Sequence, residues 1–419
     1  MEGNEDLNCA MREAGLTQAE LADAVNAHLR AHGHEGTVSD RTVRHWLTGK
    51  SRWPHRRQRD ALEAVFGRTA EELGFVPPGR PSPAVEPEQH VRRRNFLMAT
   101  TATAAMVTPI NSRPSMVGIT DVIRLRNGLD DLMTLDDTRG GHESLEQAAL
   151  VGASRAMDMQ HRAASQRIRQ RLFSVAADYT ATAAWSALDA RHSDRAEQHL
   201  SRALYLAGLA QDPVVELRVW NSFAMLAHQR QHFTQAVDSA QAAQATAVSR
   251  RDPLFASLAH ARTAVGHSNL GDRQAALRSL GHAGEALAKA EQGEPRPSWM
   301  AFYGPAELNS MTAIVRDRIG DAAESEAASH QALSAIPEQF RRNRALATTR
   351  LALAQLHQRD VDQACDTAAS VFGLMSGNPL PGRMRSLLGD YYRDLITVAP
   401  NAPVTREWGD RYRLEWSRA

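Results

Sequence analysis

Apolar residues recur at helical spacing along most of the chain. Leu7, Met11 and Ala14 share one face of a helix, and Leu21 and Val25 share one face of the next. The strict alternation of apolar and polar residues that is typical of β-strands is almost absent. Aromatic residues make up only 5% of the chain, whereas alanine is abundant, which favours closely packed helices over a β-sandwich. The pattern therefore predicts an all-α protein.

Start and stop signals mark the ends of the first helices. Thr17 stands where a helix N-cap belongs, and Glu20 three residues later completes a capping box. Ser39 is the expected N-cap of a third helix, which Gly49 is expected to end as the residue after the C-cap. On this third helix the inward face carries Val43, Trp46 and Leu47, and the opposite face carries Asp40, Arg41, Arg44 and His45.

A helical repeat occupies the larger part of the chain, which reads as helix after helix from about residue 115. Five segments share a short turn, a small residue, and small or apolar residues four and seven positions later. The small anchors, spaced by 40, 40, 49 and 39 residues, are Ala196, Ala236, Ala276, Ser325 and Ala364. Twelve residues before them stand Ala184, Ala224, Ala264, Ala313 and Ala352. Small residues at both places let two antiparallel helices approach closely, so the repeat predicts a stack of helical hairpins.

A proline-rich stretch separates the two kinds of pattern. Residues 76–88 contain five prolines, which cannot extend a helix and form a semi-rigid spacer. We therefore predict a small domain at residues 1–75, a linker with an arginine-rich and small-residue segment at 76–114, and a repeat domain at 115–419. Within the linker, Arg92–Leu97 and the small residues after it look like a twin-arginine export signal. Because this motif follows a folded domain, we favour the alternative, a helix start or linker that packs on the larger domain.

The distribution of charge changes what the total charge implies. A net charge of +1 over 419 residues argues against a uniformly basic nucleic-acid binder. Between residues 39 and 59, however, seven basic residues face a single acidic one, a local charge of +6, and the remaining 398 residues sum to −5. Of the 49 basic residues 47 are arginines, whose planar fork can read a guanine edge. We therefore predict a basic surface over the third helix that is more than a solvated face.

Neither export, membrane insertion nor catalysis is indicated. The acidic N-terminus lacks the apolar core of a signal peptide, and no apolar run approaches 18 residues. Cys9 and Cys365 imply no disulfide framework, so a reducing cytoplasm is the expected location. No phosphate-binding glycine loop, nucleophile elbow, HExxH or paired CxxC motif occurs, so neither an enzyme nor a cofactor is expected. Histidines 28, 32 and 34 could bind a metal, but with no cysteine nearby a solvated loop is the preferred interpretation.

The first domain resembles a known family of DNA-binding proteins. The segments GLTQAELA, VSDRTVRHWLTGK and WPHRRQRDALEAVFGRTAEELGF, in this order, resemble the helix-turn-helix of phage-repressor-like (XRE/Cro-type) transcriptional regulators. The resemblance covers about residues 5–75. It implies a five-helix domain that binds double-stranded DNA, with a supporting helix from Thr17 to Val25 and a recognition helix from Ser39 to Leu47.

The resemblance also implies roles for individual residues. Gln18 would contact the DNA backbone or brace the recognition helix. Bases would lie near Arg41, Arg44 and His45, and phosphates near Lys50, Arg52 and Arg56. The full set of implied DNA-binding residues is Thr17, Gln18, Ser39, Asp40, Arg41, Thr42, Arg44, His45, Lys50, Arg52, Arg56 and Arg57. One departure from the family is the separation of Leu21 and Val38 by 17 residues, about eleven more than usual. Either the second helix is longer or the turn carries an insertion.

The five hairpin segments resemble tetratricopeptide repeats, although their spacing exceeds the 34 residues usual for that family. A solenoid of this kind builds a concave face from the first helix of each repeat. Amide and cationic side chains on that face suit an extended peptide, and the alternative is that they are ordinary solvated positions. The candidate ligand-binding residues are Arg218, Asn221, Met225 and His228 in the second repeat and Asn269 in the third. The aromatic C-terminal tail is expected to cap the last repeat or to form a dimer contact.

The two resemblances together predict a cytoplasmic, sequence-specific transcription regulator. Its repeat domain would sense a peptide, a small ligand or a protein partner, as in peptide-receptor regulators, and so modulate DNA binding. One recognition helix makes few base contacts, so a homodimer on paired half-sites is expected. No membrane partner is predicted. Two alternatives stay open: an adaptor whose repeats bind a partner protein, and an exported protein that uses the twin-arginine motif.

Overall fold

Helices are the regular secondary structure of the described part of the chain. The computed structural model describes residues 3–77, 117–139, 143–291, 296–376, 380 and 382–417, and within these ranges it contains no β-strand. This confirms the all-α prediction. Most of the predicted linker and the motif at Arg92–Leu97 lie outside the described residues. Among the described helices, none is both long and apolar enough to cross a bilayer.

Contacts divide the chain into two compact units, which are described separately below. Unit 1 consists of Met1–Ile123 with Arg162–Ala164, and unit 2 consists of Arg124–His161 with Ser165–Ala419. Helix α5, Ile119–Arg139, passes from the first unit into the second.

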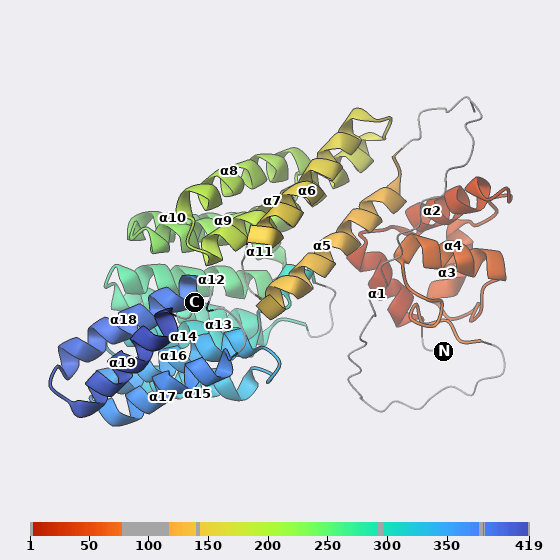
Figure 1. Cartoon of the computed structure of the whole chain (residues 1–419). Coiled ribbons are helices and arrows are strands. Elements are labelled where there is room, and N and C mark those ends of the chain that lie inside the picture. Colours follow the sequence, from red (N-terminus) through yellow and green to blue (C-terminus); the bar gives the residue numbers. More distant parts are fainter. Residues whose placement is uncertain are drawn as a thin grey trace. The chain divides into compact units, whose positions relative to one another are not determined.

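Unit 1 contains four helices before the proline-rich stretch (Figure 1). They are α1 (Glu5–Glu13), α2 (Gln18–Ala31), α3 (Asp40–Leu47) and α4 (Arg56–Phe66). The fifth helix that the family resemblance implied is not formed as such. Instead, one turn after Thr69 is closed by a backbone bond from Leu73 to Thr69 and by the carboxylate of Glu72, which accepts from the Thr69 amide at 2.8 Å. Gly74, at φ +75°, ends this turn before a second one can form.

The core of unit 1 is built from the apolar faces read from the sequence. Leu7, Leu21, Val43 and Leu62 are fully buried, one from each helix. Trp46 is 1% exposed and stands edge-on to Phe75, with ring centroids 6.3 Å apart. Packing of this kind gives an aromatic pair about 0.5–1.5 kcal/mol beyond its area burial. Trp46 thus anchors α3 to the turn that replaces the fifth helix.

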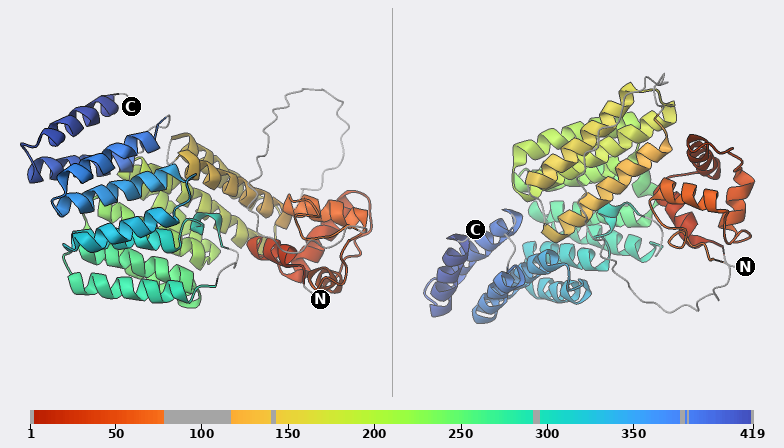
Figure 2. Two further views of the ribbon diagram at one scale, coloured as in Figure 1. Left: turned by 90° about the horizontal axis from the view of Figure 1, so that it is seen from below. Right: turned by 45° about the vertical axis from the view of Figure 1, so that its right-hand side comes forward.

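Unit 2 is a series of helices joined by short turns. Its elements after α5 are α6 (Glu143–Asp158), η1 (Met159–His161), α7 (Gln166–Asp189), α8 (Ser193–Ala210), α9 (Pro213–Gln229), α10 (Phe233–Ala245), α11 (Ala247–Arg251), α12 (Pro253–Asn269), α13 (Arg273–Ala288), η2 (Ser298–Met300), α14 (Pro305–Arg318), α15 (Ala322–Ala335), α16 (Arg341–His357), α17 (Val361–Leu374), α18 (Gly382–Val398) and α19 (Pro403–Ser417). The hairpins stack one after another in chain order (Figure 2).

The predicted hairpins are confirmed in both pairing and register. The five pairs are α7 with α8, α9 with α10, α12 with α13, α14 with α15, and α16 with α17. Every predicted small anchor and its partner twelve residues earlier is buried, none with more than 3% exposed. At the one anchor that is not alanine, the Ser325 hydroxyl donates to the carbonyl of Ala313 at 2.8 Å. Small side chains therefore lie where the two helices of a hairpin touch.

Each hairpin turn contains one residue with left-handed backbone, always at the same place in the repeat. These residues are Arg191, Gln231, Gly271, Gly320 and Arg359, and their steps of 40, 40, 49 and 39 reproduce the spacing of the anchors. The nine extra residues of the third step fall between α13 and α14. There, Trp299 and Tyr303 enter the core of unit 2, so the insertion is filled by its own apolar side chains.

The stack of hairpins closes on itself between its first and last members. Asp189 at the end of α7 is completely buried and lies 2.8 Å from Arg383 Nε of α18 and 3.4 Å from Arg342 Nη2 of α16. The backbones also meet there, because a Cβ on Gly382 would lie 2.9 Å from the carbonyl oxygen of Ala190. Residues 194 positions apart are thus in contact. The end of α7 is thus joined to α16 and α18.

The C-terminal pair α18–α19 covers the apolar face of the last predicted hairpin. Trp408 of α19 is 3% exposed and packs on Tyr391 at 4.9 Å between ring centroids and on Phe372 of α17 at 6.4 Å. The prediction that the aromatic tail caps the last repeat is confirmed for these residues. Whether the same tail also forms a dimer contact stays a prediction.

Candidate functional site

The start of α3 is held by local hydrogen bonds around Ser39, the N-cap that the sequence predicts. The Ser39 hydroxyl accepts from the Thr42 amide at 3.4 Å, and the Thr42 hydroxyl accepts from the Ser39 amide at 3.3 Å. Thr17 and Glu20 form the equivalent capping box at α2. Thr17, Ser39 and Thr42 therefore hold the helix starts, and Gln18 is half-buried at the first position of α2.

The outer face of α3 presents charged side chains without partners. Asp40, Arg41 and Arg44 are exposed, and His45 is half-buried. The side chains of Arg41 and Arg44 form no hydrogen bond or ion pair with any residue that the structure describes. The opposite face is buried through Val43 and Trp46. An eight-residue helix anchored on one side and carrying two free guanidinium groups on the other has the form that a DNA major groove accepts.

The charged surface continues beyond α3. Lys50, Arg52, Arg56 and Arg57 are all exposed, and within the described residues Arg56 forms a 4.0 Å ion pair with Asp60. Arg59 differs from these, because it donates to the Pro54 carbonyl at 2.7 Å and stacks 4.3 Å from the centroid of the Trp53 ring. Arg59 thus shapes the segment that displays the other basic residues.

Helix α4 begins in this basic segment in an unusual way. Its N-cap, His55, makes no side-chain capping bond, and its first turn carries Arg56 and Arg57 with no acidic residue. Positive charges at a helix N-terminus oppose the helix dipole, so they cost stability unless an anion lies nearby. The start of α4 and its two arginines therefore attract the same kind of ligand, an oxyanion such as a phosphate.

The long connection between α2 and α3 has an anchor that sequence reasoning missed. Helix α2 continues to Ala31, so the departure from the family pattern is explained by a longer helix and the loop at 32–38. The side chain of Asn26 holds the end of this loop, because its amide donates to the Val38 carbonyl at 2.7 Å and its carbonyl accepts from the Val38 amide at 2.9 Å. Both groups are buried. The sequence does hold a signal for this anchor, because Asn26 is a polar residue at an inward-facing position of α2.

We expect Asn26→Ala to destabilise unit 1 by about 1–3 kcal/mol, because it leaves the buried Val38 amide and carbonyl without partners. Asp23→Ala, an exposed change three residues earlier on the same helix, should alter the stability by less than about 0.5 kcal/mol. Thermal unfolding of both variants measures this difference. Equal midpoints would show that the loop is held by other contacts.

The predicted ligand-binding residues of unit 2 do not form one exposed surface. Arg218 is 5% exposed and is bound internally, with Nη1 3.0 Å from Asp178 Oδ1 and Nη2 2.9 Å from the Thr182 hydroxyl. Asn221 is 6% exposed and accepts from Arg262 Nε at 3.0 Å. Arg218 and Asn221 thus connect α9 to its neighbours α7 and α12. To contact a ligand, Arg218 and Asn221 would first have to break these hydrogen bonds.

His228 and Asn269 belong to a second group that faces the interior. Arg318 Nη2 donates to Nε2 of His228 at 3.1 Å, and the Asn269 amide lies 3.1 Å from Nδ1 of the same ring. Burial, together with the charge of Arg318, lowers the pKa of His228 to about 3, so the ring is neutral at physiological pH. Met225 is half-buried on the same helix. The sequence therefore predicted His228, Asn269 and Met225 as members of this group, but it did not predict Arg318, which donates to His228.

Comparisons with known proteins find a similarity in the N-terminal part of the chain. The family described as the SP15 N-terminal domain matches residues 7–74, the part that contains α1 to α4. No helix-turn-helix or tetratricopeptide family is matched. A search of the curated proteins finds no match. The chain thus carries a match to the SP15 N-terminal domain at residues 7–74, and the described residues after it form a long all-helical region of stacked hairpins.

Proposed function

We propose that this protein is a DNA-binding transcription regulator whose unit 1 reads double-stranded DNA with α3. The observation that carries the proposal is the outer face of α3, where Arg41 and Arg44 are exposed and have no partner among the described residues, while Val43 and Trp46 hold the helix in place. Arginines three residues apart lie on one side of a helix and can each donate two hydrogen bonds to a guanine edge.

The basic residues after α3 complete this interface. Lys50, Arg52, Arg56 and Arg57 are suited to phosphates, since they are exposed and lie in a segment with a local charge of +6. The remainder of the chain is mildly acidic, which limits non-specific attraction to DNA elsewhere on the surface. We propose that two chains act together, because one short helix contacts too few base pairs for tight specific binding.

Unit 2 is proposed to be the regulatory part, which binds a ligand or a partner and alters DNA binding. Such coupling requires that the ligand bind the DNA-competent and the DNA-free state with different affinity. An adaptor function, in which unit 2 recruits another protein to the bound DNA, uses the same architecture. Ligand binding to the chain in the absence of other proteins favours the sensor.

The DNA-reading proposal predicts the effect of removing the two arginines of α3. We expect Arg41→Ala with Arg44→Ala to weaken binding to a specific duplex by on the order of 30-fold or more, since each bidentate base contact contributes about 1–3 kcal/mol. Fluorescence anisotropy measures this on duplexes that the wild-type chain selects from a random pool. Wild-type affinity should also fall with salt, with a slope of log K against log salt of about −3.6 if four phosphates are contacted.

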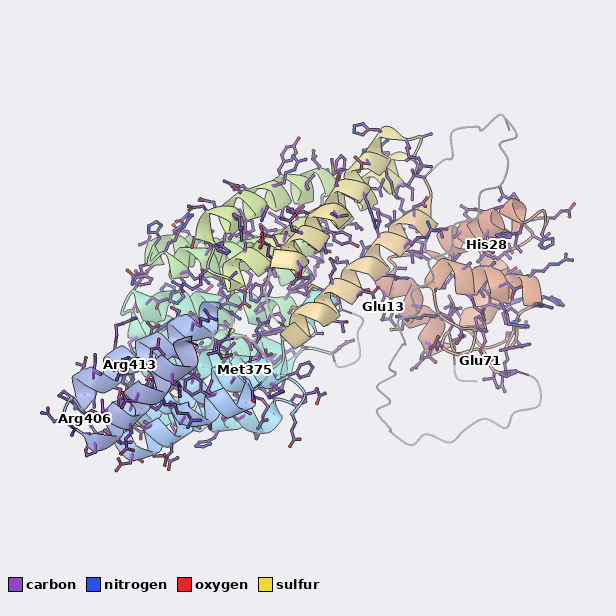
Figure 3. The ribbon with its side chains drawn as sticks, in the orientation of Figure 1. Glu13, His28, Glu71, Met375, Arg406 and Arg413 are labelled. Carbon is purple, nitrogen blue, oxygen red and sulfur yellow. The ribbon has the colours of Figure 1, made fainter. Side chains whose placement is uncertain are left out.

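A matched control separates base reading from a loss of charge. Arg278 of α13 and Arg406 of α19 are exposed arginines, and the latter is labelled in Figure 3. Arg278→Ala with Arg406→Ala removes the same charge and should leave DNA affinity unchanged. Affinity that does not depend on salt, or equal affinity of the two double variants, would contradict the proposal.

A further inference from the structure

The interior of unit 2 collects arginines from successive hairpins. Arg262 comes from α12, Arg318 from α14, Arg350 from α16 and Arg383 from α18. Each lies within electrostatic range of at least two of the others: Arg262 and Arg350 act on Arg318, and Arg383 acts on Arg262 and on Arg350. Four helices far apart in the sequence thus direct like charges into one space.

These cations are incompletely paired by the protein. Arg318 Nη1 is buried and has no hydrogen-bond partner. Within the described parts of the chain, Arg350 forms no hydrogen bond or ion pair, and neither does the nearby carboxylate of Glu307. Arg262 makes one bond, to the neutral amide of Asn221. Of the four arginines, Arg383 is the one that forms an ion pair within the described residues, with Asp189 at 2.8 Å.

The other charged groups of this space do not complete the pairing. Asp317 and Asp390 act on Arg318 and Arg350 from a distance. Asp317 is bound to His357 at 2.6 Å, and Asp390 forms an ion pair with Arg393. His228, which accepts from Arg318, is neutral. Like charges held together with counter-charges at a distance rather than in contact raise the free energy of the folded state.

Burial shifts the pKa values of the charged groups in this interior. Burial, and then the neighbouring Arg350, lowers the pKa of Arg318 to about 9, and burial lowers that of Arg262 to about 10. Burial also raises the pKa of Glu307, in spite of the positive charges around it. Burial thus disfavours an unpaired charge of either sign in this interior, and a charge-bearing ligand must bring its own counter-charge to the arginines.

We propose that the interior of unit 2 is a binding site for an anionic ligand that carries two or more carboxylate or phosphate groups, with Arg318 and Arg350 as its principal contacts. A planar guanidinium offers paired donors that match both kinds of oxyanion. Two or more anionic groups are needed because the unpaired arginines come from three different helices. The proposal deepens the sensor role of unit 2 within the proposed function and is independent of whether unit 1 binds DNA.

The test uses the full chain without DNA, at constant ionic strength. Pyrophosphate, a hexaglutamate peptide and a hexalysine peptide are titrated by isothermal calorimetry into the wild type and into Arg318→Gln with Arg350→Gln. We expect saturable binding of pyrophosphate or hexaglutamate, none of hexalysine, and about tenfold weaker binding for each arginine removed. Binding of the peptide alone would identify carboxylates as the natural groups, and binding of pyrophosphate alone would identify phosphates. The control Arg278→Gln with Arg406→Gln should bind as the wild type does.

Thermal unfolding distinguishes a ligand site from a structural cluster. If the arginines await a ligand, the melting temperature of the Arg318→Gln, Arg350→Gln chain should stay unchanged or rise, because repulsion is relieved. Saturating anion should raise the melting temperature of the wild type only. The proposal fails if neither anion binds saturably, if the double variant binds as tightly as the wild type, or if the double variant melts several degrees lower. None of these results would affect the DNA-binding measurement.

Discussion

Asp189→Asn is expected to lower the free energy of unfolding of unit 2 by about 3–5 kcal/mol, because it removes one charge from a buried cluster and leaves its partners uncompensated. Asp189 is 0% exposed and Arg342 is 8% exposed. Together with Arg383 they form the contact that joins α7 to α16 and α18. Denaturant titration followed by tryptophan fluorescence measures the loss. Opening of the closed stack should accompany it and increase the radius of gyration in solution scattering.

A matched substitution shows whether burial is the cause. Asp194 also forms an ion pair, with Arg230 at 2.8 Å, but its side chain is 94% exposed. Asp194→Asn should therefore cost less than about 1 kcal/mol. Gly382→Ala should disturb the same contact, because the new Cβ would crowd the Ala190 carbonyl. We expect it to lower the free energy of unfolding by about 1–3 kcal/mol. If Asp189→Asn is no more destabilising than Asp194→Asn, the contact between the end hairpins does not hold unit 2 closed.

Trp46→Ala should destabilise unit 1 by about 3–5 kcal/mol while leaving unit 2 unchanged, because the large side chain fills the centre of the small core. That loss is a large part of the total stability of a domain of this size. Calorimetry of the full chain should show two transitions, of which one shifts. DNA binding should be lost as well, since Arg41 and Arg44 depend on Trp46 for the placement of α3.

Trp53→Ala provides the comparison for this variant. Trp53 is half-buried at the edge of the same core and supports Arg59. Its removal should cost clearly less than the removal of Trp46 and should weaken DNA binding without abolishing it. A Trp46→Ala chain that shifts both transitions equally would contradict the independence of the two units.

The features that could be predicted from the sequence depend on contacts between residues that are close together in the chain. The capping boxes at Thr17 and Ser39, the left-handed Gly49, and the buried anchors of five hairpins depend on contacts within one helix or between two consecutive ones. A 3.6-residue period and a fixed repeat length specify such contacts directly. The basic surface of α3 is predictable for the same reason, because a short helix with one apolar face leaves the other face in solvent.

The tertiary structure alone decided the features that join distant segments. Asn26 reaches across twelve residues to hold the loop before α3, and Thr69 to Gly74 form one turn where family resemblance implied a helix. Arg218 shares a helical face with His228 but is drawn into a buried ion pair with Asp178. Helical periodicity states which side chains share a face, but not which of them a neighbouring helix will cover.

The closed stack is the clearest case of this difference. Asp189 and Arg383 are 194 residues apart, and their contact depends on the rotation that accumulates over all the intervening hairpins. A small change in rotation at each hairpin would separate them and open the interior that collects Arg318 and Arg350. Local pattern determined the hairpins and their register. The sum of their packing angles brought the arginines of distant helices close to one another.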